Sequence, residues 1–302
     1  MARAILQGGD EAGQDGRNRV DDIRTGGYSP TIRKRSLSRK LVELRKNCGL
    51  TTTQVQLQLN WSASKLNYIE KAKWIEPNSD AVADLCELYG VEGRERDALI
   101  QLAREGRQRG WWTKYNDVFS NELPGFEAGA SRIRTFETTL IPGLLQVPSY
   151  IDMVTRGAGI EGRDNAVRHV DARVERQKIL VRETDPCQLL AIMDENAITR
   201  IADPGIRKDQ LSHLIEMGAR ENVDIQVIPV SAGIYPGAGE VFELLSFPDP
   251  AERDFVFLES SFDDRMLEET DEVERYQARF DRLSAAALSC AETTALLREQ
   301  LP

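Results

Sequence analysis

The stretch TTTQVQLQLNWSASKLNYIEK, residues 51–71, decides the fold of the first part of the chain, because it predicts two short helices joined by a tight turn. Thr51 followed by Gln54 is a capping box that opens the first helix. Asn60 stands where that helix must end in the left-handed conformation, which Asn tolerates better than any residue except Gly. Ser62 then caps the second helix.

Each of these helices has an apolar inner face, with Val55 and Leu59 inward on the first and Leu66 and Ile69 inward on the second. A turn of about 100° per residue places a polar set on the opposite face of the second helix: Ser64, Asn67, Tyr68 and Lys71, with Ala63 and Lys65 at its margins. Such side chains suit base edges and phosphates in a DNA major groove, although an ordinary helical hairpin would also have a polar outer face.

Charge is distributed unevenly along the chain. The net charge is −10, yet residues 31–75 carry ten Lys and Arg against two acids, which gives this segment +8 and leaves −18 for the rest. A basic segment that coincides with the two-helix motif is an electrostatic footprint for phosphate, although a charge run is often only a solvated face. The acidic remainder should weaken indiscriminate DNA binding.

Length and composition indicate a globular protein of about two domains. The 302 residues are 41% apolar and 7% aromatic. The start of the chain does not resemble a signal peptide, and no apolar run approaches the length of a membrane span, so we expect a cytoplasmic protein without a membrane segment. The four cysteines are scattered without a CxxC pair, which is typical of reduced thiols and not of a disulfide framework or a zinc site.

The first domain is predicted to be an all-α bundle of five helices within residues 29–110, preceded by a disordered tail over residues 1–28. Besides the two-helix motif, helices are expected at residues 37–48, 80–89 and 92–105. Arg33, Lys34 and Arg35 precede the first of these and form either an arm along a phosphate backbone or a solvated lead-in.

The second domain, residues 111–302, is predicted to be α+β, with a mostly antiparallel sheet backed by helices. Strands are expected at 133–139, 188–193, 224–230, 240–247 and 254–258, and the main helices at 142–153, 164–181, 206–220, 270–288 and 292–299. In the helix at 164–181, Val167, Val170, Val174 and Ile179 should face inward and the arginines outward. Trp111 and Trp112 form either a ligand site or, more in keeping with their position, a hydrophobic joint between the domains.

We find no catalytic motif in the second domain. His169 and His213 lie on expected helices among charged residues and are interpreted as surface positions. Asp194 and Glu195 are the best carboxylate pair, but acids at a strand-to-helix junction cap the helix more often than they act as a general acid and base. We therefore expect neither an enzyme nor a bound cofactor or metal.

Residues 41–90 resemble the phage-repressor-like (XRE-type) helix-turn-helix domains of bacterial regulators. In that family an Arg of helix 1 pairs with a Glu at the end of helix 3, and the resemblance maps this pair onto Arg45 and Glu70. Further motifs, in order, look like the actinobacterial Scr-type antitoxin-like regulators from about residue 29 to the end of the chain: SPTIRKR, LNWSASKLNYIE, RGWWTKY, SRIRTFETTLIPGLLQVPSYIDMV, LLAIMDENAITR, IQVIPVSAGIYPG and FELLSFPDP.

The resemblance implies a protein partner, and it also shows where this chain differs from the family. Related regulators are encoded beside small partner proteins, and their large domain is thought to receive such a protein or another effector. Members commonly have Gly, Arg and Gly where Asn60, Tyr68 and Ala72 stand here. The loss of the Arg removes an expected phosphate or guanine contact, so the operator sequence of relatives does not transfer.

Together these observations predict a sequence-specific transcriptional regulator that binds double-stranded DNA as a homodimer. Ser64, Lys65, Asn67 and Tyr68, with Ala63 beside them, would read bases. Phosphates would be held by the remaining candidates, Thr52 and Ser62 at helix N-termini, Lys71, and the arm of Arg33, Lys34 and Arg35. The alternative hypothesis is an antitoxin-like adaptor that sequesters a small protein partner.

Overall fold

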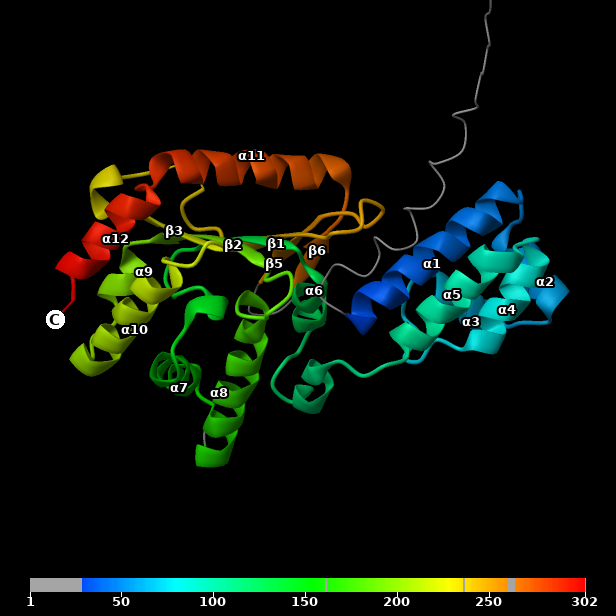
Figure 1. The fold of residues 1–302 in the computed structure, drawn as a ribbon, viewed down its shortest axis with the longest axis horizontal. Coiled ribbons are helices and arrows are strands. Elements are labelled where there is room, and N and C mark those ends of the chain that lie inside the picture. Colours follow the sequence, from blue (N-terminus) through cyan, green and yellow to red (C-terminus); the bar gives the residue numbers. More distant parts are fainter. Residues whose placement is uncertain (1–28, 161, 236, 260–263, 302) are drawn as a thin grey trace, which may run out of the picture.

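The structure, a computed structural model, describes residues 29–160, 162–235, 237–259 and 264–301. The expected tail over residues 1–28 lies outside these ranges. The described chain forms a helical domain and a larger domain built on one sheet (Figure 1). The helical domain contains five α-helices: α1 (Pro30–Asn47), α2 (Thr52–Leu59), α3 (Ala63–Glu70), α4 (Ser79–Leu88) and α5 (Gly93–Gly106). This confirms the predicted bundle.

Helix α1 begins seven residues earlier than the apolar pattern indicated. Ser29 caps it by accepting a hydrogen bond from the Ile32 amide, and Pro30 occupies the first helical position, where a missing N–H has no cost. Leu37 and Leu41 of α1 are buried with Val55 and Leu66 in the core of the bundle. The segment that carries Arg33, Lys34 and Arg35 is therefore helical.

The second domain contains seven α-helices and six strands among the described residues. In chain order, with the 3₁₀ turns, these are η2 (Trp111–Tyr115), α6 (Leu123–Gly129), β1 (Arg132–Glu137), η3 (Gly143–Leu145), α7 (Pro148–Gly157), α8 (Arg163–Gln177), η4 (Lys178–Leu180), β2 (Gln188–Asp194), α9 (Asn196–Thr199), α10 (Pro204–Met217), β3 (Val223–Ile228), η5 (Val230–Ala232), β4 (Phe242–Ser246), β5 (Phe255–Leu258), β6 (Arg265–Leu267), α11 (Thr270–Ala286) and α12 (Cys290–Glu299).

The strands form one mixed sheet in the order β3-β2-β1-β4-β5-β6. Three of its five pairings are antiparallel, as expected, whereas β1 pairs with β2, and β2 with β3, in parallel. Parallel neighbours need a long crossover, and α7 and α8 supply the one between β1 and β2. The prediction of an α+β domain is confirmed, and the parallel half of the sheet is the added finding.

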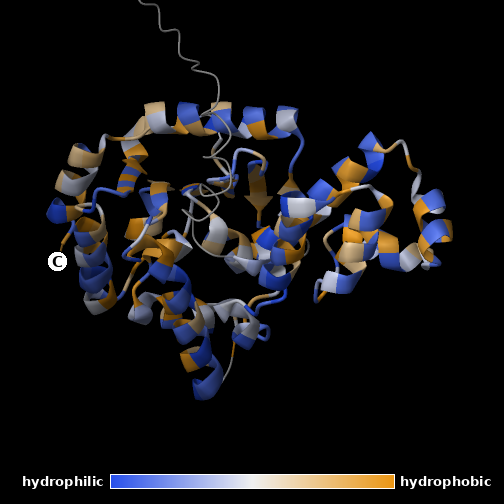
Figure 2. Cartoon of the chain, turned by 45° about the vertical axis from the view of Figure 1, so that its right-hand side comes forward, coloured by the Kyte–Doolittle hydropathy of each residue, from blue (hydrophilic) through white to orange (hydrophobic). Residues whose placement is uncertain are grey.

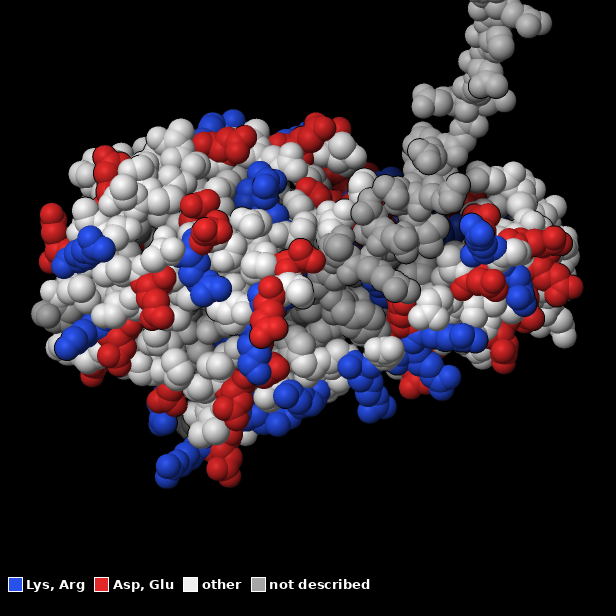
Figure 3. Space-filling view, viewed as in Figure 1, with Lys and Arg blue, Asp and Glu red and all other residues white. Residues whose placement is uncertain are grey.

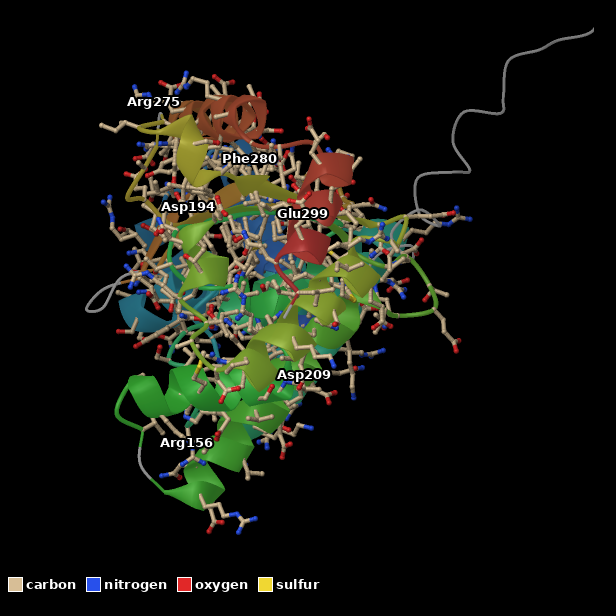
Figure 4. The ribbon with its side chains drawn as sticks, turned by 90° about the vertical axis from the view of Figure 1, so that its left-hand side faces the viewer. Arg156, Asp194, Asp209, Arg275, Phe280 and Glu299 are labelled. Atoms are coloured by element: carbon tan, nitrogen blue, oxygen red, sulfur yellow. The ribbon has the colours of Figure 1, made fainter. Side chains whose placement is uncertain are left out.

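The sheet separates two apolar layers. α11 covers one face, whereas α6, α7, α8, α10 and α12 lie toward the other (Figure 1). Polar and apolar residues alternate along these helices (Figure 2), and their buried apolar residues belong to the two layers. Phe280 is buried between α11 and the strands, while Arg275 on the same helix lies on its exposed side (Figure 4). Alternation along β1 places Ile133 in one layer and Phe136 in the other.

The two domains meet at α6, a helix that the sequence analysis did not predict. Gly129 packs so closely against α1 that a Cβ there would lie 2.6 Å from Ile32 Cγ1. Gly125 approaches the side chain of Thr31 in the same way, and its carbonyl accepts a hydrogen bond from Ser29 Oγ. Trp112 packs over Gly125. Trp112 thus lies at the joint between the domains, which is the interpretation favoured above, whereas Trp111 packs against Tyr115 and Phe119.

Helix α8 carries charge into the interior of the second domain. Arg176 binds Glu127 of α6 through two hydrogen bonds, Nε to Oε2 at 2.5 Å and Nη2 to Oε1 at 2.8 Å, and Nη2 lies 3.5 Å from Glu243 of β4. The expected inward position of Val167 is wrong, because its exposed fraction is 51% and Ala166 and Ala172 are buried instead.

Two carboxyl groups near Arg176, those of Glu137 and Glu243, have raised pKa values. Burial, with a smaller contribution from Glu243, raises the pKa of Glu137 to about 8. Burial and the neighbouring Glu127 likewise raise the pKa of Glu243 to about 8, although Arg176 acts in the opposite direction. Both groups therefore bind a proton more strongly in the folded state than in the unfolded chain.

This difference predicts a pH dependence of stability. A group with a raised folded-state pKa stabilises the fold fully below its unfolded value, near 4.5, and that contribution is lost as the pH rises through about 8. We expect the melting temperature of the wild type to fall between pH 5 and pH 9, and to fall less in Glu137→Gln. The exposed Glu183→Gln variant should behave as the wild type. Parallel curves for wild type and Glu137→Gln would contradict the assignment.

Candidate nucleic-acid interface

The two-helix motif forms through the local contacts that its sequence predicts. Thr51 Oγ1 accepts a hydrogen bond from the Gln54 amide at 3.2 Å, and Gln54 Oε1 accepts one from the Thr51 amide at 2.8 Å. Asn60 is left-handed with φ 51°, and the next amide, that of Trp61, closes the turn by donating to the Gln56 carbonyl at 2.9 Å. The capping box and the left-handed Asn60 are both confirmed.

Helix α3 begins at the predicted cap and buries the predicted residues. Ser62 Oγ accepts a hydrogen bond from the Lys65 amide at 3.2 Å. Leu66 and Ile69 are buried in the core of the bundle, which leaves Ser64, Lys65, Asn67 and Tyr68 exposed on the other side. The orientation of this helix follows from the apolar pair.

A bidentate ion pair fixes the end of α3 to α1. Arg45 donates to Glu70 from Nε to Oε1 at 2.5 Å and from Nη2 to Oε2 at 3.0 Å, and its Nη1 donates to the Leu50 carbonyl at 2.8 Å. The hydrogen bonds to Glu70 raise the pKa of Arg45. The pair that the family resemblance implied is present, and its planar geometry restrains rotation of α3 relative to the bundle.

Helices α2 and α3 enclose a polar groove of about 390 Å³. It brings together Thr52 at the start of α2 with Ala63, Ser64 and Asn67 of α3, and Gln56 and Glu70 complete its lining. Because Glu70 is paired with Arg45, its negative charge is largely offset. Thr52 and the exposed face of α3 thus form one continuous surface.

The remaining predicted residues lie around this groove. Lys65 Nζ is 3.6 Å from the centre of the Trp61 ring, a cation–π contact that holds the lysine beside α3. Tyr68 is exposed, at 53%. Ser62 uses its side-chain oxygen as a helix cap, and Lys71 directly follows α3 and lines a separate cleft between the domains. The candidate residues of α3 therefore share one side of the domain.

The prediction that Arg33, Lys34 and Arg35 form an arm is wrong. All three side chains belong to the first two turns of α1, and Arg33 Nε lies 3.2 Å from Glu105 Oε2. Arg35 points into the second domain, where Nη1 donates to Glu268 Oε1 at 2.7 Å. The segment is neither an extended arm nor a solvated lead-in. Its sequence pattern of consecutive cations could not distinguish an ion-pair partner in the protein from a phosphate.

Arg35 and Arg39 instead hold the two domains together. Glu252 of the second domain accepts a hydrogen bond from Arg39 Nη2 at 3.3 Å and lies 3.6 Å from Arg35 Nε. The Arg35 guanidinium also stacks within 5.7 Å of the ring centres of Phe126 and Phe255. Acidic and basic side chains are interspersed on both domains on the visible face (Figure 3). Part of the positive charge of residues 31–75 is therefore used for docking.

Comparison with known families covers both domains. Residues 36–99 match a family described as "Helix-turn-helix domain". Residues 121–299, more than half of the chain, match the family described as "Domain of unknown function (DUF5753)". The chain belongs to the DUF5753 family. No curated protein and no solved structure matches it.

The helix-turn-helix match identifies the function of the first domain at a coarse level. Helix-turn-helix domains bind DNA, with the second helix of the pair in the major groove. This DUF5753 protein therefore has the features of a DNA-binding protein that acts in transcription regulation. Within the described residues, no helix combines the length and apolar character needed to cross a membrane.

The structure adds one residue that the sequence analysis missed and explains two unusual ones. Gln56 lies one helical turn after Thr52, and this i, i+4 spacing could have placed it in the groove. Asn60 and Ala72, at positions where related regulators commonly have Gly, both have positive φ, of 51° and 54°. Each ends one helix of the motif, so Gly is favoured there for its backbone freedom.

Ala72 should carry strain that Asn60 does not, because a left-handed Ala is disfavoured and Asn adopts this conformation more readily. We expect Ala72→Gly to raise the free energy of unfolding by about 0.5–1 kcal/mol, despite the greater entropy of Gly in the unfolded chain. The matched variant Asn60→Gly should change it by less. Urea unfolding followed by circular dichroism measures both, and a less stable Ala72→Gly protein would show that the left-handed conformation is not strained.

Proposed function

We propose that this DUF5753 protein is a sequence-specific transcriptional regulator that reads double-stranded DNA with α3 as a homodimer on paired half-sites. Its second domain would sense a small partner protein or another effector and pass that signal to the helical domain. We further infer that it acts in the cytoplasm, belongs with the Scr-type antitoxin-like regulators, and performs no enzymatic reaction.

The observation that carries this proposal is the exposed side of α3. Its residues are polar, Asn67 makes no side-chain hydrogen bond within the described protein, and Arg45 and Glu70 fix the helix against rotation. An Asn amide presents one donor and one acceptor, which matches the N6 and N7 edge of adenine. A rigid helix with such a side chain free can distinguish base pairs, because a wrong pair leaves its polar groups unsatisfied.

The remaining residues divide into those assigned to bases and those assigned to phosphates. Ser64, Lys65 and Tyr68 flank Asn67 and would contact neighbouring base edges, with Ala63 allowing close approach. Thr52 and Ser62, at the first turns of α2 and α3, would hold phosphates, since free backbone amides and the helix dipole favour anions there. Lys71, beyond the end of α3, would hold a phosphate as a point charge.

Two substitutions separate base reading from phosphate binding. Asn67→Ala should lower affinity for the selected site by about 1–3 kcal/mol and relax preference at one base pair. Lys71→Ala should weaken binding to all DNA sequences alike and reduce the slope of log affinity against log salt concentration by about one unit. The site is first selected from random duplex DNA with the wild type, and affinities are then measured by fluorescence anisotropy over a range of salt concentrations.

Lys208→Ala, an exposed lysine on α10 in the other domain, is the matched charge control and should bind as the wild type. If Asn67→Ala loses no selectivity at any position of the selected site, the assignment of Asn67 to base contact is wrong. If the wild type enriches no sequence at all, sequence-specific binding itself is rejected.

The adaptor hypothesis gives a different result with the same variants. A chain that acts by sequestering a small protein would keep its cellular effect when Asn67 is replaced, because α3 would have no part in that contact. Reporter transcription in cells carrying Asn67→Ala, compared with Lys208→Ala, therefore separates a regulator from an adaptor.

A further inference from the structure

The second domain contains a cavity of about 240 Å³ that the DNA-binding proposal does not use. It lies between α7, α8, the end of β5 and the segment 118–124 that leads from η2 into α6. Its lining is mixed, with the apolar Leu123, Val154 and Phe257 beside polar and charged side chains, which include Thr155, His169, Arg173, Arg176 and Glu259. Concave apolar sites with a small number of convergent polar groups are typical of small-molecule binding.

Arg173 is a main polar group of this cavity, and no carboxylate of the described residues lies within ion-pair distance of it, although Glu259 on the same wall interacts with it electrostatically. Its only hydrogen bond to a described residue runs from Nη1 to the neutral Gln146 Oε1 at 3.2 Å, and it takes part in none of the ion pairs within 4.0 Å among the described residues. Arg176, one turn further along α8, is paired with Glu127 and Glu243. A half-buried guanidinium with free N–H groups favours an added anion, because charge in a poorly solvated place is costly when unpaired.

Thr155 provides an independent observation. Its exposed fraction is 1%, and its Oγ1 has no hydrogen-bond partner among the described residues, although Thr155 lines the cavity. Leaving a buried hydroxyl without a partner is destabilising, so an acceptor in the cavity would relieve that cost. His169 lies one turn before Arg173 on the same face of α8, and burial together with Arg173 lowers the pKa of this histidine. The neutral imidazole can donate one hydrogen bond.

The charge and shape of the cavity narrow the class of anion. Arg176 and Glu259 also line it, but Arg176 is already paired with Glu127 and Glu243. Arg173 is thus left to match one negative charge, whereas a dianion such as phosphate would also meet the repulsive carboxylate of Glu259. Leu123, Val154 and Phe257 would cover a compact apolar group. We propose that this cavity binds a small organic monocarboxylate, with its carboxylate on Arg173 and Thr155 and its apolar part against Leu123, Val154 and Phe257.

The position of the cavity connects it to the helical domain. Leu123 and Pro124 form part of its wall and begin α6, and α6 contacts α1 through Gly125 and Gly129. Arg168 of α8 pairs with Asp117, which holds the preceding turn against the same wall. A bound carboxylate that favours one position of α6 therefore favours one position of α1. This inference rests on the proposed function and names the class of effector.

The experiment uses the full chain and a defined set of probes: isovalerate and benzoate, their neutral amides, and inorganic phosphate, each titrated at millimolar concentrations by calorimetry. We expect saturable binding of at least one of the two acids and none of the amides or phosphate. Arg173→Gln should weaken it roughly tenfold or more, and the isosteric Thr155→Val about threefold. Arg163→Gln, an exposed arginine at the start of α8, is the control and should bind as the wild type.

Two outcomes would overturn the proposal: no saturable binding of either acid to the wild type, or equal binding to wild type and Arg173→Gln. Circular dichroism confirms that each variant is folded, and Thr155→Val tests the site if Arg173→Gln is not. Anisotropy with the selected DNA, with and without the bound acid, is measured separately. Carboxylate binding without DNA binding would reject the regulator but keep the site, and DNA binding without carboxylate binding would reject only the site.

Discussion

The buried ion pair between Arg176 of α8 and Glu127 of α6 is the interaction on which the arrangement of the two domains depends. Burial alone would lower the pKa of Arg176, but the neighbouring Glu127 outweighs it and raises the pKa, so the guanidinium remains charged. A buried ion pair contributes little net stability, yet removal of one partner leaves an unpaired buried charge and is costly. The pair therefore specifies where α6 lies, and α6 specifies where α1 docks through Gly125 and Gly129.

The charge asymmetry of the sequence has a structural counterpart at this joint. Residues 31–75 carry +8 in a chain of net charge −10. Arg35 and Arg39 direct part of that excess at Glu252 and Glu268 of the acidic domain, whereas Lys65 and Lys71 remain exposed near α3. One basic segment thus serves two purposes, docking along α1 and an exposed surface at α3. A partner that competes for Glu252 or Glu268 would act on the joint directly.

Features set by local contacts could be predicted from the sequence, and features set by distant partners could not. The capping box at Thr51, the left-handed Asn60 and the burial of Leu66 follow from neighbouring residues, and the structure contains all three. The strands β1 to β5 were also recognisable, because their apolar residues alternate or cluster. By contrast, β6 is only three residues long and is defined by its pairing with β5.

The wrong predictions, for Val167 and Arg35, also arise from partners that are distant in the sequence. On α8 the hydrophobic pattern placed Val167 inside, but Glu127 and Glu243, far away in sequence, draw Arg176 inward instead. Arg35 was assigned to phosphate because its partner Glu268 lies more than 200 residues later. Within the candidate interface, helix periodicity placed Asn67 on the correct face. The cavity at Arg173 remained hidden, since α7, α8 and β5 come together only in the folded domain.

The two left-handed residues that bracket the turn and α3 have an evolutionary consequence. Asn60 and Ala72 define both ends of this segment by backbone geometry alone, and Leu66, Ile69 and Glu70 attach it to the bundle from one side. Ser64, Asn67 and Tyr68, on the outward side, make no side-chain hydrogen bond to a described residue. These positions can change by point substitution while the buried residues that attach α3 stay constant. A lineage of such proteins can therefore acquire new target sequences without a change of fold.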